Sequence, residues 1–197
     1  CGVSCEAASS PDVLKHSSGI IFPGVGAAGR TMEMLAATGL DRALTEEIRA
    51  GKPYLGICLG MQILFDYSEE DKTPCLCILP GVVRRFPRRF RVPHMGWNDL
   101  CLVREHPLLA GIKSGTDFYF AHSYYCEPGS KDLIIGEIEY GIRFAGIVAE
   151  KNVMGVQFHP EKSSRNGLQL IRNFCLLAEA LAKDACATQA GKEENRC

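Results

Sequence analysis

Cys58 has the residue type and the setting of a catalytic nucleophile. It lies between two glycines in the segment Gly56–Gly60, where an apolar run meets an amphipathic one. This G-x-C-x-G pattern is typical of a nucleophile elbow, in which a tight strand-to-helix turn presents the side chain and flanking glycines relieve crowding. Backbone N–H groups at the start of a helix would also favour the thiolate. The alternative is a buried cysteine between two packing glycines.

A base for that nucleophile follows another apolar run. His159 and Glu161 stand in Phe158-His159-Pro160-Glu161, directly after the run Val153–Gln157. A cysteine nucleophile needs a base, and the base needs an acceptor that orients it. His159 can remove the thiol proton and later protonate a leaving amine, while Glu161 holds the imidazole tautomer. A lone loop histidine is usually only solvated, but together with Cys58 this pair predicts a catalytic triad.

A glycine-rich loop at residues 22–26, Phe-Pro-Gly-Val-Gly, follows the first clear apolar run. Such loops present free N–H groups, which can hold a phosphate or form an oxyanion hole. No Gly-Lys-Ser/Thr ending follows, so a P-loop nucleotide site is not expected.

The elements around these motifs alternate in the first half of the chain. Buried strands are expected at Gly19–Phe22 and Tyr54–Ile57, and helices are expected up to the cap Gly39, from Asp41 to Arg49, and from Leu59 to Tyr67. Strands that alternate with helices predict an α/β fold with parallel strands and crossover helices.

The second half of the chain has a different pattern. Between Pro74 and Ala149, short strands broken by Gly and Pro predict antiparallel pairing, with a hairpin around residues 139–141. A strand at Val153–Phe158 and a long helix at Gly167–Lys183 follow, and the end of the chain from Ala187 to Cys197 is expected to be a frayed polar tail. Because no linker or repeat interrupts the pattern, residues 1–186 are expected to form one domain and 187–197 a tail.

Composition excludes several classes of function. The 197 residues carry 22 Lys plus Arg and 23 Asp plus Glu, a formal charge of −1, so a polybasic nucleic-acid binder is not expected. No apolar stretch reaches the ~18 residues of a membrane span, and no signal sequence is visible, so we expect a soluble cytoplasmic protein without nucleic-acid or membrane partners.

The ten cysteines are expected to be reduced thiols, since the chain is long enough to build a core. Cys101 and Cys175 stand among apolar neighbours and are expected to pack like small hydrophobic residues. The sequence has no C-x-x-C pair and no histidine a few residues from a close cysteine pair, so a metal site is not expected.

The three motifs in this order resemble the class I, triad-type glutamine amidotransferases. Three longer segments, P-H-M-G-W-N at 93–98, Y-F-A-H-S-Y-Y at 119–125 and G-V-Q-F-H-P-E-K-S-S at 155–164, resemble one branch, the glutaminase subunits of imidazole glycerol phosphate synthase. The resemblance spans about Gly19 to Ala178. It implies a doubly wound, mostly parallel sheet flanked by helices, with an additional antiparallel region, and it implies no cofactor.

The resemblance assigns roles to individual residues. It makes Cys58 the nucleophile on the glutamine side-chain carbonyl, His159 the acid and base, and Glu161 the orienting carboxylate. The remaining roles are an oxyanion hole from the N–H of Leu59 and the loop at Val25 and Gly26, and a site for the amino-acid end of glutamine from Gln62, His122, Ser123 and Tyr124. For Gln62, the alternative is an ordinary exposed helix residue.

The resemblance also implies a partner. In this family the glutaminase forms a heterodimer with a (β/α)-barrel cyclase, which uses the ammonia to make imidazole glycerol phosphate and an aminoimidazole carboxamide ribotide. Met95, Trp97 and Asn98 match the segment that faces this cyclase. The alternative for Trp97 is a core residue, but large aromatics beside polar groups suit protein interfaces.

Three features depart from the family. Its members begin with a strand and helix that contain a D-Y-G-x-G-N-type turn; no counterpart is present, so the resemblance starts near a second strand at Val3–Ala7 and we expect an N-terminally truncated domain. Cys75-Leu76-Cys77 replaces the usual G-L-G, and the segment 86–91 is unusually basic.

Two alternatives to this function stay open from the sequence. One is the glutaminase of another synthase, such as those for anthranilate, GMP or carbamoyl phosphate, although P-H-M-G-W-N and H-S-Y-Y argue against it. The other is a noncatalytic scaffold subunit that keeps the fold. Glutaminase activity measured with the cyclase present distinguishes the three.

Overall fold

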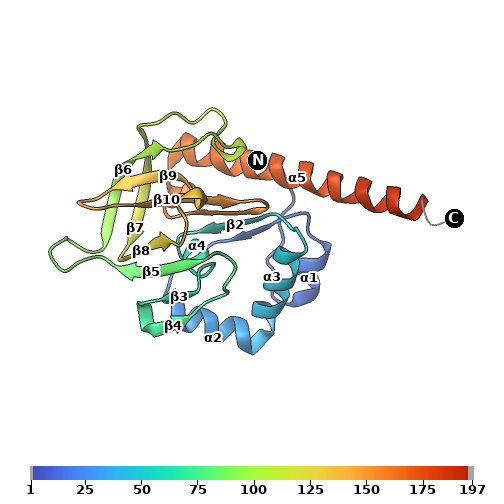
Figure 1. Ribbon diagram of the computed structural model, residues 1–197, viewed down its shortest axis with the longest axis horizontal. Coiled ribbons are helices and arrows are strands. Elements are labelled where there is room, and N and C mark those ends of the chain that lie inside the picture. The colour runs from blue at the N-terminus through green and yellow to red at the C-terminus, as the bar shows by residue number, and fades with distance from the viewer. Residues whose placement is uncertain (1, 195–197) are drawn as a thin grey trace.

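The computed structural model describes residues 2–194, with side chains through residue 183. A seven-stranded sheet has the order β1-β2-β11-β10-β9-β6-β7, and a four-stranded sheet has the order β4-β3-β5-β8. Helices α1, α2 and α3 lie on one side of the large sheet and α5 on the other (Figure 1). The α/β class with flanking helices is therefore confirmed.

The parallel part of the large sheet is built from the three strands that precede the chemical motifs. β1 (Ile20–Phe22) pairs in parallel with β2 (Tyr54–Ile57), and β2 pairs in parallel with β11 (Val153–Val156). Every residue of β2 and β11 is buried, as expected for strands with helices on both faces. Their carboxyl ends therefore lie next to each other at one edge of the sheet.

Side chains alternate along these strands and so enter two hydrophobic cores, one on each face of the sheet. Leu55 and Met154 point into a core shared with the side chains Leu170 and Phe174 of α5. Tyr54, next to Leu55 and on the opposite face, packs in a second core with the crossover helices. These helices are α1 (Pro11–His16), α2 (Ala28–Thr38) and α3 (Leu40–Arg49).

The large sheet continues as an antiparallel region. β10 (Arg143–Glu150) pairs antiparallel with both β11 and β9 (Ile134–Glu139), which confirms the expected hairpin. β9 then pairs with β6 (His94–Leu102), and β6 pairs with β7 (Thr116–His122). Four of the six pairs in this sheet are antiparallel, so the expectation of a mostly parallel sheet is wrong, because the antiparallel strands of the second half extend the same sheet. Short turns η2 (Pro107–Leu109) and η3 (Lys131–Leu133) lie between these strands.

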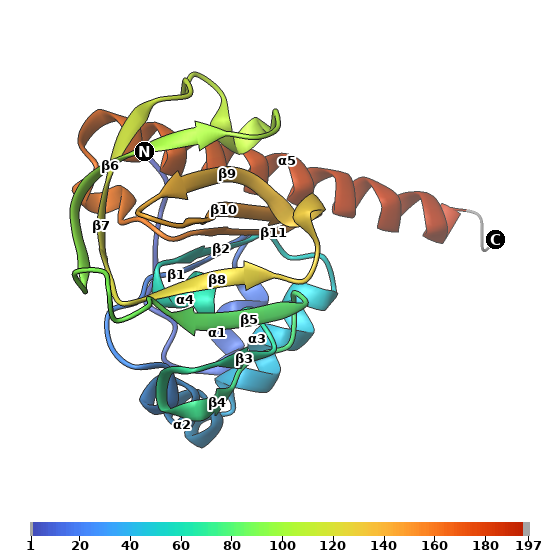
Figure 2. The same ribbon diagram turned by 60° about the vertical axis from the view of Figure 1, so that its left-hand side comes forward.

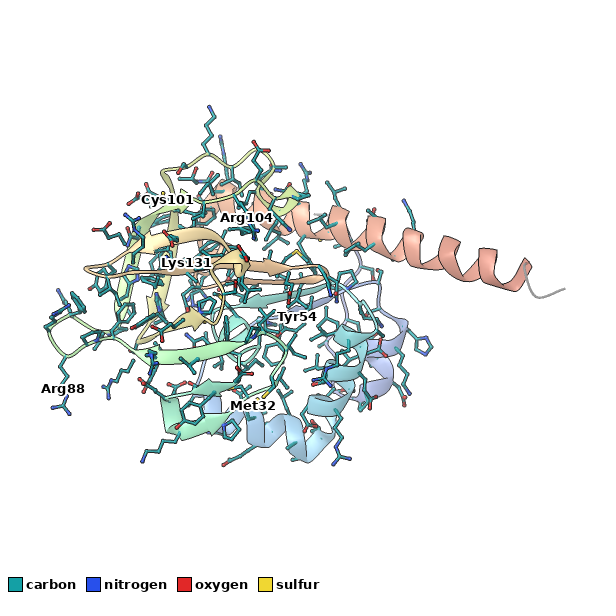
Figure 3. All side chains as sticks on the ribbon, viewed as in Figure 1. Met32, Tyr54, Arg88, Cys101, Arg104 and Lys131 are labelled. Atoms are coloured by element: carbon teal, nitrogen blue, oxygen red, sulfur yellow. The ribbon has the colours of Figure 1, made fainter. Side chains whose placement is uncertain are left out.

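The small sheet lies next to β10 of the large sheet and to helix α2. It contains β3 (Tyr67–Ser68), β4 (Thr73–Pro74), β5 (Gly81–Arg85) and β8 (Tyr124–Pro128), with the turn η1 (Glu70–Lys72) between β3 and β4. Between β5 and β6 a loop carries the basic segment 86–91, and Figure 3 shows Arg88 at its projecting tip.

Helix α4 is shorter than expected. It spans Leu59–Gln62, whereas the sequence predicts a helix to Tyr67. The carbonyls of Ile63, Leu64 and Phe65 accept hydrogen bonds from the N–H groups of residues 76–79 instead of from a further helical turn. The irregular segment 76–79 therefore ends the helix.

Helix α5 (Ser164–Glu194) is longer than expected at both ends, and its C-terminal half projects on the side opposite to β6 and β7 in both views (Figures 1 and 2). The predicted frayed tail from Ala187 is wrong up to Glu194, since the backbone there is helical; Ala, Gln, Lys and Glu are strong helix formers. Residues 195–197 of that tail lie outside the described residues.

Other expectations differ locally. Val3–Ala7 forms no strand, because no neighbouring strand pairs with these exposed residues. The second crossover helix begins at Leu40 after Gly39, not at a cap on Asp41. Cys101 is exposed rather than packed, since it falls on the outer face of β6. The helices described between residues 2 and 194 include none that is both long enough and apolar enough to cross a bilayer.

Candidate active site

Cys58 occupies a strained turn between β2 and α4. Its backbone has φ 51° and ψ −104°, a conformation that residues with a side chain rarely adopt. A Cβ on Gly56 would lie 2.2 Å from the Gly60 carbonyl oxygen, and a Cβ on Gly60 would lie 2.1 Å from the Phe22 carbonyl oxygen. Both flanking positions therefore require glycine, which confirms the expected relief of crowding.

The surroundings of the Cys58 thiol keep it protonated. Burial raises its pKa to about 12, and the charge of Glu161 adds to this. The Leu59 N–H and the Gln157 side chain act in the opposite direction, because both donate hydrogen bonds to the sulfur. The expected help from the helix start is present in the Leu59 N–H, but desolvation outweighs it. A base is therefore needed to generate the thiolate.

His159 is a buried imidazole held from several sides. Its Nδ1 lies 2.8 Å from Glu161 Oε1, and since a carboxylate only accepts, Nδ1 carries the proton and Nε2 is free to act as a base. The backbone N–H of His159 donates to the Tyr119 carbonyl at 2.8 Å, and its carbonyl accepts from Ser163 Oγ at 2.6 Å. The orienting contact predicted for Glu161 is thus present.

The sheet brings Cys58 and the segment of His159 together. Cys58 follows β2 and His159 follows β11, which are adjacent parallel strands in register, with Ile57 opposite Val156. The Cys58 N–H donates to the Val156 carbonyl at 2.8 Å. The strand ends therefore hold both groups at the same edge of the sheet, where ligands bind in open α/β sheets.

The glycine-rich loop lies directly against the elbow. A Cβ on Gly24 would be 2.5 Å from Leu59 Cβ, so only glycine allows this contact. Val25 is 85% exposed, and a Cβ on Gly26, which has φ 134°, would meet open space, so these two residues of the loop are free of packing on their outer side. The two segments expected to form an oxyanion hole are thus adjacent.

Gln62 is buried at 4% exposure, so the alternative of an ordinary exposed helix residue is wrong. Its Nε2 donates to the Tyr124 carbonyl at 3.1 Å and to Gln157 Oε1 at 3.2 Å. Gln157 Nε2 in turn donates to Cys58 Sγ at 3.6 Å. Gln62 is therefore linked to Cys58 through Gln157.

The segment His122–Tyr124 joins β7 to β8 beside Gln62. His122 is buried, with Nδ1 2.7 Å from the Tyr124 carbonyl oxygen. Ser123 is partly exposed and its carbonyl accepts from the Phe86 N–H, while burial raises the pKa of the Tyr124 phenol. Ser123 and Tyr124 are accessible to a ligand, whereas both ring nitrogens of His122 have protein partners.

The expected partner-facing residues divide between the two faces of β6. Met95 and Trp97 are 64% and 54% exposed, so the core alternative for Trp97 is wrong. Asn98 points to the opposite face, where its Nδ2 donates to the Glu139 carbonyl. The reason is that successive side chains of a strand point to opposite faces, so Trp97 and Asn98 lie on different faces. Trp97 packs edge-on against Tyr119, whose carbonyl holds the His159 backbone.

Sequence reasoning missed three residues at this site: Gln157, Glu70 and His94. Gln157 directly precedes the Phe158-His159 pair, and a polar residue at the end of an apolar run is a signal that could have found it. Glu70 accepts from the Ala28 N–H at 2.8 Å, just after the glycine-rich loop, and its charge raises the Cys58 pKa. This contact joins segments 42 residues apart, so no local pattern indicates it.

Comparison with known proteins places the chain among amidotransferases. The profile of the class-I glutamine amidotransferase family matches residues 4–178. The imidazole glycerol phosphate synthase subunit HisH of Thiobacillus denitrificans is 48% identical over 175 residues, which cover 84% of this chain and 76% of that protein. The HisH subunit of Dehalococcoides mccartyi is 45% identical over 178 residues, or 90% and 87% of the two chains.

Solved structures share the fold at low sequence identity. A protein described as a glutamine amidotransferase superposes with a TM-score of 0.72 at 19% identity, covering 90% of this chain and 88% of that one. A glutamine amidotransferase from Thermotoga maritima gives a TM-score of 0.60 at 17% identity, with coverage of 89% and 69%. At these identities the likeness concerns the fold alone.

Proposed function

Because the chain belongs to the class-I glutamine amidotransferase family, we propose that Cys58, His159 and Glu161 are the triad with which it hydrolyses glutamine. The relatives named HisH identify the enzyme as the glutaminase subunit of imidazole glycerol phosphate synthase, which serves histidine biosynthesis. One observation carries the proposal for the triad: a strained, glycine-flanked cysteine follows β2 where the His159–Glu161 pair follows the adjacent strand β11.

The reaction begins with proton transfer. His159 Nε2 takes the Cys58 proton, which is necessary because burial holds the thiol neutral. The thiolate attacks the side-chain carbonyl carbon of glutamine, and the oxyanion of the tetrahedral intermediate is stabilised by the N–H of Leu59 and an N–H of the loop at Val25 and Gly26. The C–N bond then breaks, ammonia leaves with the proton from His159, and a thioester remains.

Hydrolysis of the thioester completes the cycle. His159 takes a proton from water as the water attacks the thioester carbonyl. The C–S bond then breaks and releases glutamate, and the Cys58 sulfur takes the proton back from His159. Glu161 keeps the imidazole in the Nδ1–H tautomer through both steps. Gln62, whose Nε2 donates to the Tyr124 carbonyl, holds the amino-acid end of glutamine together with Ser123 and Tyr124.

The ammonia is passed to a (β/α)-barrel cyclase that forms a heterodimer with this chain. The exposed face formed by Met95, Trp97 and Tyr119 supports this part of the proposal, because it joins the loop that carries the base. Lys162, which follows Glu161, lies 5.9 Å from the centre of the Tyr119 ring. A partner on this face would therefore touch the catalytic loop directly.

Replacement of Cys58 by Ala tests the triad. In the complex with the cyclase, Cys58→Ala should abolish glutamine-dependent turnover and leave ammonium-dependent turnover intact, since only the nucleophile is lost. Cys77→Ala, which removes an exposed thiol in the segment after β4, is the matched control and should retain both activities. Full glutamine-dependent turnover in Cys58→Ala would overturn the assignment.

A further inference from the structure

Two histidines on neighbouring strands form a buried pair beside the candidate active site. His94 on β6 lies directly opposite His122 on β7, and His94 Nδ1 is 3.0 Å from His122 Nε2. Each ring has a second polar partner: Asn98 Nδ2 is 3.3 Å from His94 Nε2, and the Tyr124 carbonyl oxygen is 2.7 Å from His122 Nδ1. All four ring nitrogens therefore have a partner.

The same Tyr124 carbonyl connects this pair to the nucleophile. It also accepts from Gln62 Nε2 at 3.1 Å, and Gln62 reaches Gln157 Oε1 at 3.2 Å. Gln157 then donates to Cys58 Sγ at 3.6 Å. An unbroken series of hydrogen bonds thus runs from β6 to the catalytic sulfur.

The partners of the two rings fix which nitrogen of each ring carries the proton. A carbonyl only accepts, so His122 carries its proton on Nδ1 and accepts at Nε2. His94 must then donate from Nδ1 and accept at Nε2. The orientation of the Asn98 amide agrees independently, because its Nδ2 donates to the Glu139 carbonyl at 3.0 Å and its Oδ1 accepts from the Asp99 N–H at 2.9 Å.

The pair is surrounded by groups that favour neutral rings. His94 is stacked between Phe120 and Tyr140, with ring centres 4.8 Å and 4.1 Å away, and Phe86 and Phe144 lie against both histidines. Burial lowers the pKa of His94 to about 4 and that of His122 to about 3.

The titratable groups near the pair do not favour a charge on it. Positive charge on His159 or on the other member of the pair disfavours protonation of His122. The Tyr140 phenol, the remaining titratable group stacked on His94, has its hydroxyl bonded to the Arg91 carbonyl. Protonation of His122 at Nε2 would also place two donors face to face across the 3.0 Å contact, and protonation of His94 at Nε2 would face the Asn98 Nδ2 donor at 3.3 Å.

We propose that His94 and His122 are positioning residues for the glutaminase site. Locked as neutral Nδ1–H imidazoles, they hold the Tyr124 carbonyl in the place where it orients Gln62, and through Gln62 and Gln157 they set the position of Cys58 Sγ. The catalytic part of this inference rests on the proposed function, whereas the tautomers do not. His122 thus acts on glutamine through Tyr124 and Gln62 rather than by touching it.

Ring-nitrogen NMR of the chain labelled with ¹⁵N-histidine tests the tautomers. Both rings should carry the proton on Nδ1 and stay neutral between about pH 5 and 8, as their lowered pKa values require. Assignment by His94→Asn and by the exposed control His16→Gln separates their signals. A proton on Nε2 of either ring, or titration of either ring in this range, would overturn the proposal even if the chain hydrolyses no glutamine.

Two amide substitutions test the positioning role in the complete complex. The amide nitrogen of Asn can take the place of Nδ1 and still donate to His122, whereas that of Gln takes the place of Nε2 and leaves His122 without a donor. We expect kcat/KM for glutamine to fall by about 10-fold or more in His94→Gln and to stay within about 3-fold of the parent in His94→Asn.

Packing alone would give a different result. Both substitutions remove the ring stacked between Phe120 and Tyr140, so a purely structural role predicts equal losses of activity and of thermal stability in the two variants. Equal losses would overturn the proposal. The proposal would be supported if His94→Asn keeps the activity that His94→Gln loses and if His122 remains an Nδ1–H tautomer in His94→Asn. No glutamine hydrolysis in the parent complex would instead count against the proposed function.

Discussion

The two side chains of the His159–Glu161 contact differ in burial. The imidazole is almost completely buried, while the Glu161 side chain is 51% exposed and lies 2.8 Å away. Water screens a half-exposed carboxylate, so its effect on the energy of the imidazolium is moderate. The contact therefore matters more for orienting the ring than for stabilising its charge.

This difference predicts unequal effects of removing the two groups. His159→Ala should lower kcat for glutamine hydrolysis by roughly 10²- to 10⁴-fold, the range for loss of a general acid and base. Glu161→Gln should cost less, because the amide oxygen can still accept from Nδ1–H. Steady-state kinetics of the complex measures both, and a larger loss for Glu161→Gln would show that the carboxylate does more than orient.

Gln157 tunes the thiol through its N–H donor. Gln157→Glu replaces that donor with a negative group beside a sulfur that already feels Glu161 and Glu70, so the pKa of Cys58 should rise further. A higher pKa means less thiolate at a given pH. We therefore expect iodoacetamide to alkylate Cys58 more slowly at pH 8 in this variant than in the parent. Mass spectrometry of the peptide that contains Cys58 measures the rate.

The neutral variant Gln157→Met separates charge from hydrogen bonding. It removes the donor without adding charge, so its alkylation rate should lie between those of the parent and Gln157→Glu. If the glutamate variant reacts faster than the parent, the hydrogen bond to Cys58 Sγ does not favour the thiolate.

At the scale of elements, the elbow depends on close backbone contacts. A side-chain rotation cannot relieve a clash with these backbone atoms. The Cβ of an alanine at position 56 would lie 2.2 Å from the Gly60 carbonyl oxygen and 2.6 Å from the Met61 nitrogen. Tyr54, on the same strand, donates its hydroxyl to that carbonyl at 2.9 Å and so fixes it. Strand, turn and helix thus form one rigid unit around Cys58.

Gly56→Ala should therefore destabilise the protein by about 3 kcal/mol or more, at the upper end of overpacking effects. The matched control is Gly129→Ala, where the new Cβ would be 3.3 Å from Pro80 Cβ and the cost should stay within about 1 kcal/mol. Urea unfolding of both variants gives the comparison. Equal stabilities would contradict the tight elbow.

At the scale of the molecule, the outer face of β6 and β7 joins the surface to the site. Trp97 lies opposite Tyr119 in the strand register, and Tyr119 holds the His159 backbone. Large exposed aromatic residues such as Trp97 are frequent anchors of protein interfaces. Association at this face would thus act on His159 through two neighbouring residues.

Trp97→Ala should weaken association with the cyclase by about 1 to 4 kcal/mol, as for aromatic anchors. Because Trp97 is 54% exposed, the free energy of unfolding of the isolated chain should change little. Leu176→Ala, which truncates an exposed side chain on α5, is the control and should leave affinity unchanged. Calorimetric titration measures the affinity, and thermal unfolding measures the stability. Unchanged affinity with a lower midpoint of thermal unfolding would show that Trp97 stabilises the fold and does not contribute to association.

Local sequence patterns determined the parallel part of the fold and the motifs at its edge. The span of β2, the Gly39 cap of α2 with φ 70° and the β9–β10 hairpin follow from apolar runs and turn residues that act over a few positions. The Cys58 elbow could be predicted for the same reason, since the steric demand that selects its glycines arises between neighbours in the chain.

Tertiary structure decided what lies between these motifs. The end of α4 at Gln62 and the pairing of His122 with His94 depend on contacts with segments well separated in the sequence. Hydrogen-bond partners of a buried polar group are chosen by the whole fold, because each group must be paired where it is buried. The chain alone therefore indicated a nucleophile and a base, and only packing decided which buried groups hold them in place.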